Sequence, residues 1–175
     1  MNFNINHNNQ HYMFRLASDS DVPQIRQLLN DSYKELADMG LNYTASYQDE
    51  DETRKRMAKG RTFVLLSGKE IIGTILYYAR NEITGKNSAY LEQFAISPKL
   101  KRLGLGSIIM DFCEQLANDE KYEAIQLNTA QPATHLVEWY KRRGYKIVAE
   151  THIEGKVYDS YIFEKTLRAA FSKKK

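Results

Sequence analysis

The stretch KLKRLGLGS, from Lys99 to Ser107, combines the residue types that bind anions. Three cationic residues precede Gly104 and Gly106, and an apolar-periodic run follows. The first turn of a helix has unpaired backbone N–H groups and a partial positive charge, and glycines there let a ligand approach the backbone. The stretch therefore predicts an anion site at a helix N-terminus. A tight strand-to-helix turn without a ligand is the alternative.

A dinucleotide-binding fold is disfavoured by the same stretch. That fold would place a third glycine at position 109, where this chain has Ile109, and its loop would follow the first strand. The anion and its chemistry therefore have to be inferred from the flanking residues.

Length and composition limit the class of protein. The chain has 175 residues, which fit one domain, and its 25 Lys and Arg against 22 Asp and Glu leave a net charge of +3. This excess falls short of the basic face of a nucleic-acid binder, and no stretch reaches the ~18 apolar residues of a membrane span. The single cysteine, Cys113, is expected in the core and predicts a reducing, cytoplasmic location. We expect neither a nucleic-acid nor a membrane partner.

Apolar periodicity predicts a mixed order of strands and helices. Residues 1–11 are Asn-rich and are expected to be a disordered tail, residues 12–167 a single domain, and residues 168–175 a basic tail. The expected strands cover residues 12–17, 61–66, 70–79, 89–97, 123–130, 145–151 and 158–167, and the expected helices residues 22–40, a segment ending near 60, 105–120 and 132–144. This order indicates an α/β (α+β) fold with a mixed, mostly antiparallel sheet of about seven strands flanked by about four helices.

The residues around the glycines resemble the acyl-CoA signature of the GNAT superfamily of N-acyltransferases. In FAISPKLKRLGLGS, Ile96 and Pro98 take the aliphatic and proline places, and Gly104 and Gly106 take the glycine places. The family's Arg or Gln position holds Lys101, which supplies charge without the two-pronged geometry of Arg.

A second segment, LNTAQPATHLVEWYKRRGYKIV, is similar to the family's next motif, in which a helix ends in Tyr, three residues, Gly and an aromatic. Tyr140, Gly144 and Tyr145 match it, whereas Ala133 stands where the family commonly has Asn. The resemblance covers nearly the whole chain.

The resemblance implies a donor site for acetyl-CoA, used as a cosubstrate. No pair of His or carboxylate residues has metal-ligand spacing in the sequence, so no metal is expected. The backbone N–H groups of about Leu103 to Ser107 would hold the pyrophosphate, and the strand edge at Phe94, Ala95 and Ile96 would pair with the pantetheine arm. The cofactor-binding set is Phe94, Ala95, Ile96, Lys101, Arg102, Leu103, Gly104, Leu105, Gly106 and Ser107.

Acyl transfer to an amine needs a deprotonated amine and a proton for the departing thiolate. The resemblance implies Tyr140 as the general acid, and Glu92 stands where several family members keep a base. Each has a structural alternative: Tyr140 as a core residue, Glu92 as a salt-bridged strand residue. Asn128, where other members place a base, cannot accept a proton, and His135 and His152 are two further relay candidates.

The acceptor is expected to be a primary amine on a small molecule or a protein. Tyr43 and Tyr47 lie between the first two helices and Tyr158 in the last hairpin, where the family recognises acceptors. The function predicted is therefore N-acetylation by direct attack in a ternary complex, and a homodimer is left open. The alternative is a non-catalytic acyl-CoA-binding regulatory module.

Overall fold

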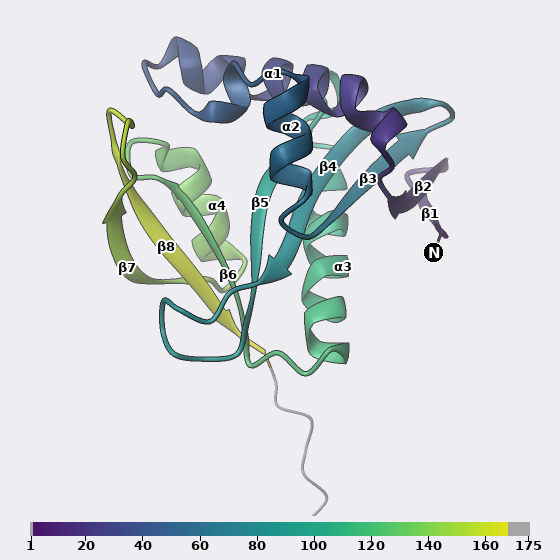
Figure 1. Ribbon diagram of the computed structural model, residues 1–175. Coiled ribbons are helices and arrows are strands. Elements are labelled where there is room, and N and C mark those ends of the chain that lie inside the picture. Colours follow the sequence, from purple (N-terminus) through teal and green to yellow (C-terminus); the bar gives the residue numbers. More distant parts are fainter. Residues whose placement is uncertain (1, 168–175) are drawn as a thin grey trace, which may run out of the picture. The chain divides into compact units, whose positions relative to one another are not determined.

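The computed structural model describes residues 2–167 and contains eight strands and four α-helices within them (Figure 1). The basic tail predicted at 168–175 lies outside this range. The strands are β1 Asn2–His7, β2 Gln10–Leu16, β3 Arg61–Ser67, β4 Glu70–Ala79, β5 Ser88–Ile96, β6 Ala124–Ala130, β7 Lys146–His152 and β8 Asp159–Thr166. The helices are α1 Val22–Asp38, α2 Glu50–Met57, α3 Leu105–Asp119 and α4 Thr134–Arg142.

The strands form one mostly antiparallel sheet in the order β1-β2-β3-β4-β5-β6-β8-β7. Strands β5 and β6 pair in parallel over Ser88–Leu91 and Ala124–Leu127. The register between β3 and β4 shifts beside Gly73, between the pairs Leu65–Gly73 and Leu66–Ile71. The predicted fold class is confirmed, with one strand more than expected.

The additional strand is β1, and β2 begins at Gln10, so the disordered tail expected at residues 1–11 is wrong for residues 2–11. The residues of β1 pair with β2 in antiparallel register, from Asn2 opposite Arg15 to His7 opposite Gln10. Phe3, Ile5 and His7 are partly buried while the intervening asparagines are exposed. This period of two is the strand pattern, and the Asn-rich composition hid it.

Contacts divide the described residues into two compact units, which we treat separately. The first comprises the residues up to Tyr77 and Glu92–Ile109, and the second Tyr78–Leu91 and the residues from Met110 on. In the first unit, α1 buries its apolar face against β3 and β4. This core contains Ile25, Leu28, Leu29, Ala45, Val64, Leu66, Ile71 and Ala95.

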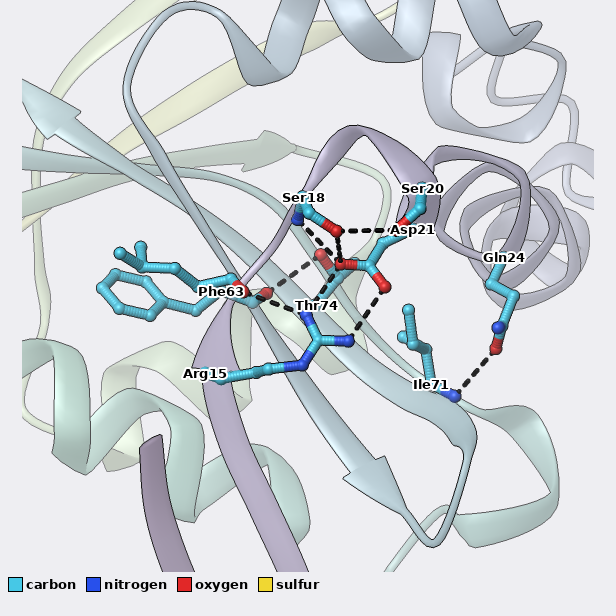
Figure 2. Close-up of polar contacts among 9 residues, drawn as sticks. Arg15, Ser18, Ser20, Asp21, Gln24, Phe63, Ile71 and Thr74 are labelled. Carbon is cyan, nitrogen blue, oxygen red and sulfur yellow. Dashed lines mark hydrogen bonds and ion pairs between the residues drawn. The ribbon is translucent and has the colours of Figure 1, made fainter. Parts of the chain in front are cut away.

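Helix α1 begins at a polar junction that fixes its position beside β2. The Arg15 guanidinium donates two hydrogen bonds to the Asp21 carboxylate, at 2.7 and 2.9 Å, and the Ser18 backbone N–H donates to the same carboxylate at 2.7 Å (Figure 2). These contacts, with Arg15 first, lower the pKa of Asp21 from 3.8 to about 2 despite its burial. Pro23 follows in the first turn, where a missing N–H costs nothing.

The core of the second unit includes a cluster of aromatic rings. The Tyr140 ring from α4 lies 5.6 Å from Phe163 in β8 and 5.9 Å from Tyr145, measured between ring centroids. Cys113 in α3 is fully buried, which confirms its expected place in the core.

None of the helices within residues 2–167 has the length and apolar character that a membrane crossing requires.

Candidate functional site

The predicted anion loop lies in the first unit, between β5 and the start of α3. A short 3-10 turn at Pro98–Leu100 follows β5, and Arg102 and Gly104 then adopt left-handed φ angles of 66° and 81°. Gly104 tolerates this conformation without strain, whereas Arg102 does not. Lys101 to Gly104 are exposed, and α3 begins at Leu105. The loop backbone is therefore exposed and leads directly into the N-terminus of α3, which is the arrangement that an anion site requires.

Two side chains from outside the loop hold it. Lys101 Nζ forms an ion pair with Glu35 of α1, and both side chains are exposed. The Lys101 ammonium, which the sequence predicts to bind phosphate, therefore already contacts a carboxylate. His7 Nε2 lies 2.6 Å from the Leu103 carbonyl oxygen. Sequence reasoning missed His7 because it assigned this residue to a disordered tail.

Strand β5 changes character at Gln93. This residue has a left-handed φ of 53°, and the pairing with β6 ends two residues earlier, at Leu91. Glu92 contacts Arg56, and Gln93 contacts Gln48, so two consecutive side chains reach residues 48–59. The left-handed Gln93 is the point where the regular extended backbone of β5 is interrupted.

Helix α1 contacts the β5 backbone just beyond Gln93. Tyr33 donates its hydroxyl hydrogen to the Phe94 carbonyl, and Ser32 donates to the Ile96 carbonyl, both at 3.0 Å. The Ser97 N–H donates to Ile72 of β4 at 2.8 Å, so neighbouring backbone groups of β5 point to opposite edges. Phe94 and Ile96 thus direct their carbonyls away from β4, whereas Ala95 falls on the β4 edge.

Glu92 is an ion-paired residue that is largely removed from solvent. Its Oε2 lies 3.3 Å from Arg56 Nη2 and 3.2 Å from Lys59 Nζ, and its side chain is 14% exposed. Arg56 keeps a buried Nε–H with no hydrogen-bond acceptor. The three residues form a cluster with one negative and two positive charges. Sequence reasoning missed Arg56 and Lys59 because a charged run on a short helix also fits a solvated face.

Tyr140 lies on the buried side of α4 and is 7% exposed. Its ring packs edge-on against Trp139 and Tyr145, at 5.0 and 5.9 Å. The neighbouring Tyr145 hydroxyl donates to Glu114 at 3.1 Å, and burial together with Glu114 raises the pKa of Tyr145 well above its usual value. The Tyr140 side chain as a whole is therefore largely shielded from water.

The tyrosines predicted for the acceptor site differ in exposure. Tyr43 and Tyr47 flank the 3-10 turn Thr44–Ser46 in the first unit. Tyr43 stacks at a tilt on Tyr33, 5.3 Å between centroids, and Tyr47 is 63% exposed. Tyr158, in the second unit, is buried.

Two of the remaining candidates, Asn128 and His152, have hydrogen-bond partners. Asn128 Oδ1 accepts a hydrogen bond from the Tyr90 hydroxyl at 3.2 Å. His152 Nδ1 lies 2.8 Å from Asp159 Oδ1 across the exposed β7–β8 hairpin, and His135 is exposed on α4. Within residues 2–167, no three His, Cys, Asp or Glu side chains gather as metal ligands.

A cavity of about 360 Å³ borders the residues that lead into the loop. It is lined by Gln24, Gln27, Leu28, Asp31, Glu70, Ile71, Ser97, Pro98 and Lys99. Two of the lining residues are joined by a hydrogen bond, in which Gln24 accepts from the Ile71 N–H at 3.1 Å (Figure 2). None of the predicted site residues lines this cavity.

Comparison with known proteins gives a family match and two relatives. Residues 22–145 match the Acetyltransferase (GNAT) family. The S-(2-succino)cysteine N-acetyltransferase of Bacillus subtilis (strain 168) is 26% identical over 159 residues, which are 89% of this chain and 96% of that protein. The S-alkylcysteine N-acetyltransferase of the same organism is 24% identical over 150 residues, 83% of this chain and 84% of that protein.

Solved structures share the fold at lower identity. The ribosomal-protein-S18-alanine N-acetyltransferase from Escherichia coli superposes with a TM-score of 0.72 at 11% identity, over 94% of this chain and 99% of that one. A GNAT family acetyltransferase from Listeria monocytogenes 4b F2365 gives 0.72 at 17% identity, over 94% and 100%. At these identities the likeness extends to the fold alone.

Proposed function

The chain belongs to the GNAT acetyltransferase family and is an acyl-CoA-dependent N-acetyltransferase, and from this premise we propose that it acetylates the α-amine of a small amino acid with a substituted side chain. The acceptor class rests on the two relatives, which are named for S-(2-succino)cysteine and S-alkylcysteine. The observation that carries the proposal is the cluster of Glu92, Arg56 and Lys59.

The cluster matches an α-amino acid in charge. A free amino acid has an ammonium group and a carboxylate one carbon apart. When the amino acid binds, its ammonium group pairs with Glu92. Arg56 and Lys59, released from Glu92, pair with the carboxylate of the amino acid. Every buried charge therefore keeps a partner of opposite sign. The buried Arg56 Nε–H gains the acceptor that it lacks in the free protein. The net charge of +1 also favours acceptors that carry additional carboxylates.

The donor is acetyl-CoA, bound at the loop from Lys101 to Ser107. Backbone N–H groups at the start of α3 fit a pyrophosphate, and the Phe94 and Ile96 edge fits the amides of a pantetheine arm. Arg102, exposed and next to the glycines, adds positive charge to that of Lys101.

The reaction is a direct attack in a ternary complex. Glu92 removes a proton from the ammonium, and the free amine attacks the thioester carbonyl. The tetrahedral intermediate then collapses, the C–S bond breaks, and the thiolate takes a proton from the Tyr140 hydroxyl. The second proton that the nitrogen loses as it becomes an amide returns through solvent to the Tyr140 oxygen, and the proton on Glu92 is released to solvent. A cytoplasmic location and a homodimer remain predictions.

A pair of acceptors tests the proposal. S-benzyl-L-cysteine and S-benzylcysteamine share the amine and the thioether, but only the first has a carboxylate. With free thiol as the readout, we expect kcat/KM to be at least about 10-fold higher for the first acceptor. Equal values, or a preference for a peptide N-terminus, would contradict the proposal. In Arg56→Gln the preference should shrink toward unity.

A further inference from the structure

The tip of the β1–β2 hairpin is a tight turn that contacts the loop that we assign to the pyrophosphate. Asn8 and Asn9 have φ angles of 51° and 59°, and His7 pairs with Gln10 across them. Two left-handed residues in a two-residue connection form the tight turn that matches the twist of a hairpin, and asparagine tolerates this conformation. His7 therefore projects from an ordered strand end.

The contact between His7 and the loop has a defined direction. A carbonyl oxygen only accepts, so the His7 Nε2 atom, 2.6 Å from the Leu103 oxygen, must donate its hydrogen. Asn8 Nδ2 lies 3.5 Å from the same oxygen. A Cβ on Gly104 would lie 3.2 Å from His7 Nε2, so the absence of a side chain there lets the imidazole lie against the loop.

Fixing this carbonyl also fixes the next N–H. The described peptide bonds are trans, and in a planar trans peptide the C=O and N–H point in opposite directions. With the Leu103 carbonyl turned toward the hairpin, the Gly104 N–H must point away from it. We propose that His7 is a positioning residue of the donor site, which holds the Leu103–Gly104 peptide so that its N–H faces the pyrophosphate of acetyl-CoA.

This inference rests on the proposed donor loop, and its test separates the two. The full-length His7→Ala variant should bind CoA about 3- to 10-fold more weakly by calorimetry, which corresponds to one hydrogen bond. Its kcat/KM should fall for acetyl-CoA but not for S-acetylpantetheine, which lacks the pyrophosphate. His7→Gln retains an N–H donor and should stay within about 2-fold of the unchanged protein.

His11→Ala is the matched control, since His11 lies on the same hairpin but contacts Asn6 instead of the loop. Unchanged CoA affinity in His7→Ala would overturn the inference, as would an equal loss with S-acetylpantetheine. If Gly106→Leu also leaves CoA affinity unchanged, the donor loop itself is wrong. If Gly106→Leu abolishes binding and His7→Ala does not weaken it, only the role of His7 is wrong.

Discussion

Glu92 and Arg56 lie 36 positions apart in the sequence, yet Glu92 Oε2 and Arg56 Nη2 are 3.3 Å apart. Lys59 contacts the same carboxylate oxygen. One cation is enough to neutralise the charge of a carboxylate in a structural ion pair, and a carboxylate exposed to water needs no cation to neutralise it. Two roles are therefore open for Glu92: a structural ion pair, or binding of the acceptor and removal of its proton. Substitution of Glu92 and Arg56 can distinguish them.

Glu92→Gln should lower kcat by about 100-fold or more, because general-base assistance is worth about 100- to 10,000-fold. The loss should shrink as pH rises, since the free amine then forms without help. The measurement is kcat against pH with S-benzyl-L-cysteine as the acceptor. A profile parallel to that of the unchanged enzyme would leave Glu92 as a salt-bridged strand residue.

Arg56→Gln is the matched variant for this experiment, because it removes a cation and keeps the carboxylate. We expect a higher KM for the amino acid and a smaller change in kcat, as binding of the carboxylate is lost while the base remains. A loss of kcat as large as that in Glu92→Gln would indicate that the ion pair itself, and not proton transfer, matters.

Substitution of Gly106 should separate stability from binding. Gly106 lies in the first turn of α3, where a side chain would occupy the space predicted for the pyrophosphate. Gly106→Leu should abolish CoA binding in calorimetry. Because glycine in a helix costs about 0.5–1 kcal/mol relative to alanine, Gly106→Ala should not lower the melting temperature but should weaken binding. Unchanged affinity in Gly106→Leu would remove the donor loop from the proposal.

Sequence periodicity predicted the order of elements from residue 12 to residue 167, because apolar spacing and glycine turns are local properties. It also predicted the anion loop, since cations, glycines and helix start are contiguous. It missed β1, whose alternating Phe3 and Ile5 were outweighed by asparagine content, and the left-handed Gln93, a conformation that a glutamine does not signal. The contacts of Arg56 and His7 depend on tertiary packing, which no local pattern encodes.

The ion pair between Arg15 and Asp21 predicts a pH-dependent contribution to stability. The folded pKa of Asp21, about 2, is below its usual 3.8, so the stabilisation is fully present above pH 4 and is lost as pH falls through 2. The shift corresponds to about 2 kcal/mol. In urea unfolding, the stability difference between the unchanged protein and Asp21→Asn should be about this size at pH 7 and should narrow toward pH 2.

Asp19→Asn is the control for this experiment, because Asp19 pairs with Arg54 on the surface and surface pairs contribute little. It should leave both the stability and its pH dependence nearly unchanged. A constant difference between Asp21→Asn and the unchanged protein from pH 7 to pH 2 would show that the carboxylate is not stabilised by its charge.

Tyr140→Phe tests the proposed general acid. The substitution keeps the ring contacts with Trp139, Tyr145 and Phe163 and removes only the hydroxyl. A phenol with an ordinary pKa near ~10 stays protonated at neutral pH and is close enough to the ~8.5 of a thiol to protonate it as it leaves. We expect kcat to fall by about 100-fold or more while the Kd for acetyl-CoA stays constant.

Tyr145→Phe is the matched control, because the Tyr145 hydroxyl donates a hydrogen bond to Glu114. Loss of this hydroxyl should lower the stability of the protein and leave kcat unchanged. If Tyr140→Phe turns over within about 3-fold of the unchanged enzyme, the thiolate takes its proton from another donor and Tyr140 serves only the core.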